Sequence, residues 1–424
     1  MQEDFLHHIW KFQKFSKVTL KSDEEEPIEI VHQGTHNFNS GPDFFNAQIK
    51  IGNQLWVGNV EIHLKSSDWY AHHHEIDKAY DNVILHVVWE HDVEVYRKDN
   101  SVIPTLVLKH RVDNFALAKY NTLFSNKKHW IACEEDFPEV DDFLIENWME
   151  RLYFERLENK SNVILELLKA SKNDWEAVFF QMLAKNFGLK NNAEAFLSMA
   201  QSFDFSVLRK IQDKPIQLEA LLFGQADLLE IESEDSYVNN LKKEYNFLKN
   251  KFKLENSQVA PVQFFRLRPV NFPTIRLAQL AAVYSANEQL FSKIISVKTK
   301  EEIYALFDVS ASNFWDTHFH FSSVSPPRKK RLTKAFIDLL IINTIVPLLF
   351  CYNKHIGKEN SETLITLMSS IKKEENTIVS KYNDLKLVAE SALQSQALIE
   401  LKINYCDKKK CLQCAVGNRL LQKN

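Results

Sequence analysis

Glycine and cysteine are both scarce in this chain of 424 residues, which contains 8 glycines and 5 cysteines. The 30 phenylalanines, set against so few glycines, favour a helix-rich interior packed with aromatic rings. Five cysteines, three of them close to the carboxyl end, do not suit a disulfide framework and are typical of a reduced intracellular protein. Hydrophobic and charged fractions of 45% and 25% are ordinary for a folded globular protein.

Excess basic charge and a long apolar run are also missing. The formal net charge is -4, so any nucleic-acid surface has to be a local patch. The first ten residues, MQEDFLHHIW, lack the basic and then apolar order of a secretory signal. The most apolar run, residues 335–352, is interrupted by polar residues and a proline and is too short for a bilayer span, so we expect a core helix. These absences predict a cytoplasmic protein with no membrane partner, and the oligomeric state is not indicated.

Strand and helix signals divide the chain into a mixed amino-terminal part and a long helical remainder. The first part predicts helices at 2–15 and 75–80 and strands at 18–20, 28–31, 44–51, 55–64, 82–89 and 105–108. From about residue 113 helical periodicity dominates, as at 143–168, 174–187 and 215–229. We therefore predict an α+β protein with an α/β domain at 1–112, which carries a mixed sheet, a helical domain at 113–257, and a helical domain at 258–424 that ends in a cysteine cluster.

Acidic and basic side chains gather on one predicted β-hairpin. Gly52 and Asn53 predict the turn between the strands at 44–51 and 55–64. Side chains alternate across a strand, so Glu61, His63 and Lys65 share one face while Val60, Ile62 and Leu64 bury the other. Asp43 opens the preceding strand, and neighbouring strands lie about 5 Å apart. The two carboxylates are therefore expected to converge on one divalent ion.

The order helix, three strands, helix, strand, with Pro42-Asp43 before one strand and Glu61-x-His63 in the next, resembles the PD-(D/E)XK nuclease superfamily. The resemblance implies a restriction-endonuclease-like fold in which Asp43 and Glu61 bind Mg²⁺ or Mn²⁺ and a basic residue positions or activates the attacking water. His63 stands where the family normally has lysine, and Lys65, two residues on, is the other candidate for this role. Glu3 is a further candidate acid on the first helix. Otherwise, Asp43 caps a turn and Glu61 pairs with a neighbour on a solvated face.

A histidine-rich segment, SDWYAHHHEID, follows the hairpin. His73, His74 and Asp77 are expected to line the rim of the same cleft. Imidazole ligands favour Zn, Fe or Mn over Mg, which leaves open a cupin-like metal enzyme with Glu61, His63, one histidine of the triplet and His86 as ligands. Against that alternative, the predicted strands are too few for a double-sheet roll. The simplest interpretation is that these histidines only line a polar loop.

The carboxyl-terminal cysteines are spaced as metal ligands. Cys406, Cys411 and Cys414 form a C-x4-C-x2-C pattern that suits Zn²⁺ or an iron-sulfur cluster if Cys133 supplies the fourth thiolate. Some PD-(D/E)XK nucleases similarly hold a cluster with one distant cysteine and three near the carboxyl terminus. Their distant cysteine precedes the nuclease core, whereas Cys133 follows it. The alternative is that these are reduced, partly buried thiols.

A cluster of arginines, Arg266, Arg268 and Arg276, surrounds the sequence RPVNFP just before a predicted helix. Arginines beside a helix start suit phosphate contacts, so this cluster is the candidate nucleic-acid surface. Equally, such charges often form only a solvated face.

The chain as a whole also resembles a bacterial family known only as a domain of unknown function. The segments GPDF, VEIH, SDW, HxHxxD, NVILHVVW, RPVNFP and YC-x4-C-x2-C carry this likeness, which implies no activity. We therefore expect an Mg²⁺-dependent nuclease or a nuclease-derived nucleic-acid-binding protein. A non-catalytic protein with a helical interaction surface is the alternative of a different class.

Overall fold

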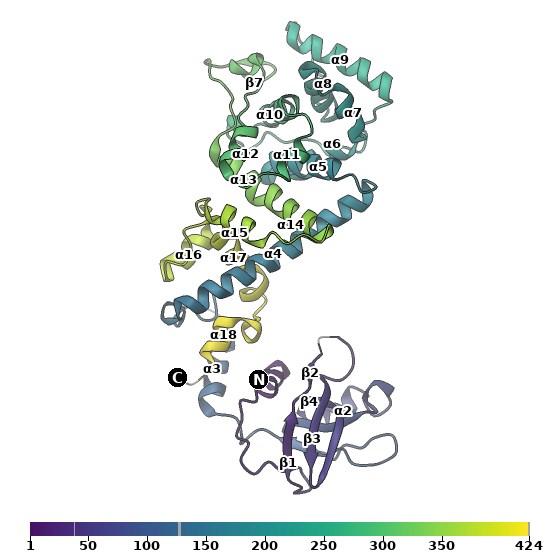
Figure 1. Ribbon diagram of the computed structural model, residues 1–424, viewed down its shortest axis with the longest axis vertical. Coiled ribbons are helices and arrows are strands. Elements are labelled where there is room, and N and C mark those ends of the chain that lie inside the picture. The colour runs from purple at the N-terminus through teal and green to yellow at the C-terminus, as the bar shows by residue number, and fades with distance from the viewer. Residues whose placement is uncertain (38, 126–128, 423–424) are drawn as a thin grey trace. The chain divides into compact units, whose positions relative to one another are not determined.

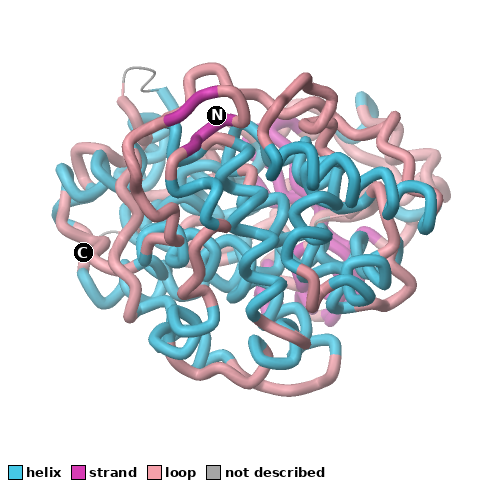
Figure 2. The backbone as a smooth tube through the Cα atoms, turned by 90° about the horizontal axis from the view of Figure 1, so that it is seen from above, coloured by secondary structure: helices cyan, strands magenta, loops and turns pink. Residues whose placement is uncertain are grey.

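The structure is a computed structural model that describes residues 1–37, 39–125 and 129–422. The chain folds as two compact units, residues 1–148 with 401–424, and residues 149–400. The first unit contains a mixed sheet, and helices dominate the second (Figure 1). Most of the regular structure is helical, as the cyan segments of Figure 2 show. The predicted α+β class is therefore confirmed. The sequence had suggested three domains with boundaries near residues 113 and 258, whereas the structure divides into two units. The cysteine-rich carboxyl end, expected in a helical domain, belongs to the first unit.

The first unit is built around a six-stranded sheet, counted over its described residues. Strands β1, β3, β4, β5 and β6 are neighbours in that order, and β2 pairs with β3. The β1–β3 and β3–β4 pairs are antiparallel, whereas β4–β5 and β5–β6 are parallel. The strands are β1 Ile28–His32, β2 Thr35–His36, β3 Phe44–Ile51, β4 Gln54–Lys65, β5 Val83–Glu90 and β6 Thr105–Val107.

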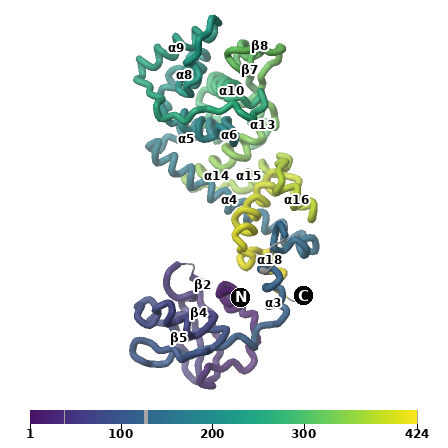
Figure 3. The backbone as a smooth tube through the Cα atoms, turned by 180° about the vertical axis from the view of Figure 1, so that it is seen from behind, coloured from purple at the N-terminus to yellow at the C-terminus, as the bar shows by residue number. Residues whose placement is uncertain are grey.

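Short helices complete this unit. They are α1 Glu3–Lys11, α2 Asp68–Ala71, η1 Lys78–Tyr80, α3 Asn114–Ser125, η2 Phe137–Glu139, the start of α4 Asp142–Ala170, η6 Leu401–Cys406, η7 Cys411–Gln413 and α18 Ala415–Leu420. The views of Figures 1 and 3 both show α18 beside α3. Leu412 and Leu421, at the carboxyl end, belong to the same buried cluster as Leu123 of α3.

The predicted hairpin is confirmed at the expected turn. Ile51 pairs with Gln54, and Gly52 between them has a φ of +59°, a conformation that costs glycine little. Ala47, Ile49 and Ile51 alternate with exposed residues along β3, as the pattern predicted. In β4, however, residues 58–63 are all buried. The face expected to carry polar chemistry is therefore covered as well.

Two apolar clusters explain this burial. The larger one joins α1 to the sheet through side chains such as Phe5, Ile9, Ile49, Ile62 and Val87. The smaller one contains Trp69, Val83, Val95 and Ile103. Because the Trp69 ring lies 5.6 Å from that of His86 and 5.4 Å from that of His74, this second cluster covers the polar face.

Two local predictions were wrong. Residues 18–20 form a turn instead of a strand, since Val18 is exposed and Thr19 adopts a φ of +49°. The helix expected at 75–80 is only the 3₁₀ turn at Lys78–Tyr80. The α-helix of this loop is α2, which begins at Asp68 and ends before the predicted helix starts.

The helical unit confirms the long periodic segments, with Asp174 capping α5 by accepting hydrogen bonds from the N–H groups of Glu176 and Ala177. Its elements are the rest of α4, α5 Trp175–Phe187, α6 Leu189–Gln201, α7 Phe205–Ile211, α8 Pro215–Gln225, α9 Ser236–Phe252, η3 Pro269–Asn271, α10 Pro273–Ala286, α11 Leu290–Ile294, α12 Lys300–Leu306, η4 Asn313–Asp316, β7 His318–His320, β8 Ser323–Val324, α13 Lys334–Leu340, η5 Ile341–Ile345, α14 Val346–His355, α15 Ser361–Ser369, α16 Thr377–Leu385 and α17 Ala392–Glu400.

One helix in the described part of the chain, residues 334–355, is long and apolar enough to cross a membrane. Of its most apolar window, 67% is buried inside the protein, which agrees with the core helix expected there. Its middle is a π-helical turn, Ile341–Ile345.

A buried carboxylate in this unit gives a stability prediction. Glu219 accepts hydrogen bonds from the hydroxyls of Tyr237 and Ser312, and the Tyr237 hydroxyl in turn accepts one from Trp315 Nε1 at 3.0 Å. We expect Tyr237→Phe to lower the free energy of unfolding by about 1 to 3 kcal/mol, because buried partners lose a donor and an acceptor. Urea unfolding measures this loss. Tyr96→Phe, at an exposed site, is the control, and an equal loss in both variants would contradict the buried-network argument.

Candidate metal centre

Asp43 and Glu61 do come together. The Asp43 N–H donates to Glu61 Oε2 at 3.1 Å, and Asp43 Oδ2 accepts from the N–H of Ile62 at 3.0 Å. These reciprocal bonds lock the start of β3 to the middle of β4, where Phe44 pairs with Val60. The side chain of Asp43 is 20% exposed and that of Glu61 only 6%. The hairpin therefore holds one carboxylate at the surface of the site and the other beneath it.

Helix α1 brings two more ionisable groups to the carboxylates. His7 Nε2 lies 3.2 Å from Asp43 Oδ2. Burial lowers the pKa of His7, but Asp43, Glu3 and Glu61 more than compensate, so its pKa is raised overall. Burial raises the pKa of Glu3 to about 7, with Asp43 adding to the shift. The position suggested for Glu3 by sequence is thus within electrostatic range of the acidic pair.

The positive charge and N–H donors around Asp43 and Glu61 do not offset the cost of keeping both carboxylates ionised. Burial and the neighbouring Asp43 carboxylate raise the pKa of Glu61 to about 9. The groups that lower its pKa are the Asp43 N–H and His7, and both are outweighed. Carboxylates confined in this way are stabilised by a cation.

His63 lies at the centre of a cluster of imidazoles. Its Nδ1 is 2.8 Å from His86 Nε2, and its Nε2 is 3.2 Å from His72 Nδ1. The same Nε2 is 3.6 Å from Glu61 Oε1, which is also 3.3 Å from His74 Nε2. Burial and these three histidines lower the pKa of His63 to about 2, so the ring is neutral. His63 therefore offers a lone pair, not the positive charge of a lysine.

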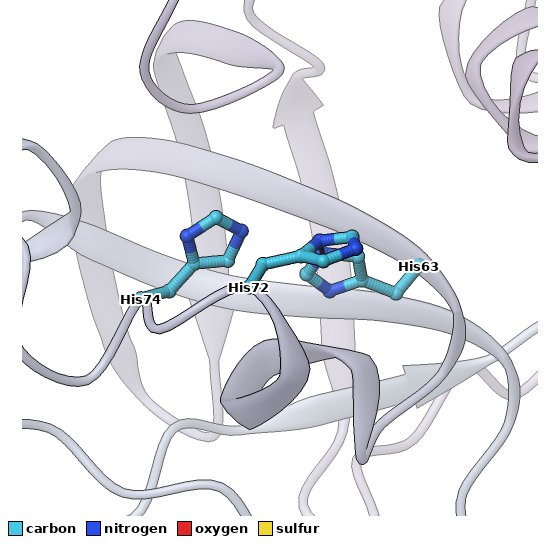
Figure 4. Close-up of side chains that lie close together, drawn as sticks. All are labelled: His63, His72 and His74. Atoms are coloured by element: carbon cyan, nitrogen blue, oxygen red, sulfur yellow. Dashed lines mark hydrogen bonds between the residues drawn. The ribbon is translucent and has the colours of Figure 1, made fainter.

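The loop after β4 aims alternate histidines at the sheet. Helix α2 ends at Ala71, and His73 then adopts a left-handed φ of +61°, which turns the chain back. The rings of His72 and His74 lie beside that of His63, as Figure 4 shows, although His72 is exposed to solvent, and the His73 side chain is 76% exposed. Tyr80 stacks on His74 with the ring centroids 3.8 Å apart.

Serine and aspartate side chains anchor this loop. Ser66 and Ser67 both hydrogen-bond the Asp92 carboxylate, and Ser66 Oγ accepts from the Asp92 N–H. Asp68 accepts from the N–H of Lys65 at 2.9 Å and so closes the turn that leaves β4. The loop is therefore tied to the ends of β4 and β5.

The rim residues named from the sequence have different positions. His74 is inside the cluster. Burial lowers its pKa overall, and the carboxylates of Asp43 and Asp77 offset only part of that shift. Asp77 is exposed and caps the turn at Lys78. His72 was considered from the sequence only as one member of the histidine triplet and was left out of the rim residues, although the HxHxxD spacing pairs it with His74. On the first helix only Glu3 was considered from the sequence. No spacing pattern pointed to His7.

Lys65 stays outside the cluster. It is exposed at the end of β4, and its charge acts on Asp92. Lys65 shares a strand face with Glu61 and His63, but its side chain is exposed at the strand end whereas theirs are buried.

The three candidate arginines all lie in the helical unit. Arg276 is buried, donates to Asn271 and Gln279, and lies 3.6 Å above the Phe336 ring. We therefore assign Arg276 to packing and not to phosphate binding. Arg266 and Arg268 are exposed, so their guanidinium groups stay accessible.

The cysteines of the carboxyl end and Cys133 occupy one region of the first unit. Burial raises the pKa of Cys133 well above its usual value, and Cys406, Cys414 and Cys411 raise it further. Cys414 is buried and receives hydrogen bonds from the N–H groups of Val416 and Gly417. Among the described residues, however, only His63, His72 and His74 have their ligand atoms all within 4.8 Å of one another. The thiols are near neighbours without that convergence.

The fold and site define an α+β protein with a centre made of carboxylates and histidines. A family model described as a protein of unknown function (DUF2851) matches residues 3–377, and the chain belongs to that family. No curated protein and no solved structure matches it. The matched region contains the whole carboxylate and histidine centre and ends before Cys406.

Proposed function

We propose that this protein is a metal-dependent nuclease, in which Asp43 and Glu61 hold the catalytic divalent ion. The observation that carries the proposal is the contact between these two residues across β3 and β4. The topology also supports a restriction-endonuclease-like fold. An antiparallel β1–β3–β4 meander follows α1, and a crossover containing α2 and η1 leads to β5, which is parallel to β4.

The residues fit a bound divalent ion. The Asp43 carboxylate is close enough to Glu61 and to Glu3 to raise the pKa of both, so negative charge gathers at this position. Oxygen ligands of this kind suit Mg²⁺ or Mn²⁺. When bound, the ion would lower the pKa of a water ligand and neutralise charge developing on phosphate.

The side chains around the ion have separate tasks. The N–H of Ile62 fixes Asp43 Oδ2, and the N–H of Asp43 fixes Glu61 Oε2, so the ligand oxygens are oriented before substrate arrives. His7, held against Asp43, is a donor for a phosphate oxygen. His63 Nε2 supplies a lone pair beside Glu61 and not the ammonium group that the resemblance implied. Exposed Arg266 and Arg268 are the remaining candidates for contacts with the nucleic-acid backbone.

Cleavage assays test the proposal. Single- and double-stranded DNA and RNA are incubated with Mg²⁺ or Mn²⁺, and we expect Glu61→Gln to reduce cleavage at least about 100-fold, since a ligand charge is lost. Glu29→Gln, the same change on the exposed edge strand β1, is the matched control. Absence of cleavage by the folded wild type with either metal would reject the nuclease. Metal-independent nucleic-acid binding would then favour a nuclease-derived binding protein, and no binding would favour an interaction protein.

We also propose a structural metal, Zn²⁺ or an iron-sulfur cluster, at Cys133, Cys406, Cys411 and Cys414. Support comes from the C-x4-C-x2-C spacing and from the proximity of these thiols, whose charges act on one another. Burial raises the pKa of Cys414 although the N–H groups of Val416 and Gly417 lower it, so a thiolate there needs the positive charge that a metal supplies. The turn is also tight, because a Cβ on Gly417 would lie 2.1 Å from the carbonyl oxygen of Cys411. Glycine here lets α18 fold closely over the segment that carries two of the cysteines.

A further inference from the structure

The side chains of His63, His72 and His74 lie close together (Figure 4), and one ligand nitrogen from each lies within 4.8 Å of the other two. A tetrahedral ion with metal–nitrogen bonds of 2.0 to 2.1 Å has ligand atoms about 3.3 to 3.4 Å apart. His63 Nε2 and His72 Nδ1 are 3.2 Å apart, and Glu61 Oε1 is 3.3 Å from His74 Nε2 and 3.6 Å from His63 Nε2. Three of the six ligand pairs therefore lie within about 0.3 Å of the length of a tetrahedral edge, and the two remaining histidine pairs are within 4.8 Å.

The surrounding side chains orient these ligands. A ligating histidine usually passes its second N–H to a neighbouring acceptor, and His63 has His86 Nε2 at 2.8 Å from its Nδ1 for this purpose. His74 is held between Tyr80, stacked at 3.8 Å, and the edge of Trp69. His72 is exposed, so an ion has a route of entry from solvent.

Without an ion, the same atoms form a hydrogen-bonded relay. His86 can donate to His63, His63 to His72, and His74 to Glu61. Such a relay needs contacts only between successive pairs of side chains. It does not require one nitrogen atom of each of the three histidines to be close to both others. The left-handed backbone at His73 places His72 and His74 on the same side of the loop, facing His63, which serves a common ligand better than it serves separate pairs.

We propose that His63, His72 and His74, together with Glu61 Oε1, bind one transition-metal ion of the Zn²⁺, Mn²⁺ or Fe²⁺ class. Imidazole nitrogen and a carboxylate select such ions over Mg²⁺. Glu61 presents Oε2 toward Asp43 and Oε1 toward the histidines, so it bridges this position and the carboxylate position. The inference thus deepens the proposed nuclease, which becomes a two-metal centre with one oxygen-rich and one nitrogen-rich position.

Titration of metal-free, full-length protein with Co²⁺ tests this site. Tetrahedral Co²⁺ bound by nitrogen and oxygen absorbs in the visible range, whereas thiolate ligands add a near-ultraviolet charge-transfer band, so the cysteines are recognised separately. We expect His72→Ala, which alters an exposed side chain, to weaken the nitrogen-site affinity at least about 10-fold, and His74→Ala to do the same. His110→Ala, at an exposed histidine outside the cluster, is the matched control and should bind as the wild type does.

The outcomes separate this inference from the proposed nuclease. Asp43→Asn should lose Mg²⁺-supported cleavage and keep the Co²⁺ site, because Asp43 is not one of its ligands. Equal Co²⁺ binding by His72→Ala, His74→Ala and the wild type would overturn the metal site and leave the relay. Co²⁺ binding with the expected histidine dependence, but no cleavage of any nucleic acid, would retain the metal site and reject the nuclease.

Discussion

Glu61→Gln is expected to unfold at a higher temperature than the wild type when no divalent metal is present, and to lose most of the stabilisation that Mn²⁺ gives the wild type. The Glu61 carboxylate is buried next to Asp43, and burial together with that neighbour opposes its charge. Glutamine has the same shape and still accepts from the Asp43 N–H. Because the pKa of Glu61 is raised on folding, its carboxyl must take up a proton near pH 7, a cost that glutamine avoids, so the free energy of unfolding should rise by about 1 to 3 kcal/mol.

In the presence of a divalent metal, we expect the wild type to be more stable than Glu61→Gln. An ion at 100 times its dissociation constant stabilises a protein by about 2.7 kcal/mol, and only the wild type keeps the full ligand set. Thermal unfolding in EDTA and in Mn²⁺ measures both effects in one experiment. Glu29→Gln should follow the wild type in both buffers, because Glu29 is exposed on β1. A Glu61→Gln variant that is less stable in EDTA, or that gains as much from Mn²⁺ as the wild type, would argue for a purely structural carboxylate.

The convergence of Asp43 and Glu61 could be predicted because it depends on local rules. A two-residue turn at Gly52 fixes the hairpin register, and the register determines which residues face each other. The turn therefore sets the pairing from Ile51 back to Ala47, and a bulge at which Asn46 adopts a φ of +56°, not indicated by the sequence, shifts it by one residue so that Phe44 meets Val60. The same alternation placed Glu61 and His63 on one face, which the structure brings together as well.

The histidine cluster could not be predicted to the same degree. Whether His72, His73 or His74 points inward depends on one left-handed residue, and nothing in a run of three histidines says which one adopts it. The alternation that grouped Lys65 with Glu61 was correct for the strand, but it does not say how far a cluster extends along it. Arg276 shows the same limit, because its charge was visible in the sequence and its burial against Phe336 was not.

The cysteine-rich end illustrates a long-range effect. Its spacing suggested a metal, but the periodicity around it suggested only more of the helical region. In the structure, residues 401–424 belong to the sheet-containing unit, and Leu412 and Leu421 share a core with residues of α1. A segment this short contributes few apolar contacts of its own, so a metal would add much of what holds it in place.

Cys414→Ser is accordingly expected to remove the metal bound by the thiols and to lower the free energy of unfolding of the first unit by about 3 kcal/mol or more. Metal analysis of the purified protein identifies zinc or iron, and thermal unfolding gives the stability. Cys351→Ser is the matched control, since Cys351 is also a buried thiol but lies in the helical unit. Burial alone predicts similar destabilisation in both variants with unchanged metal content, whereas a thiolate centre predicts metal loss only when Cys414 is replaced.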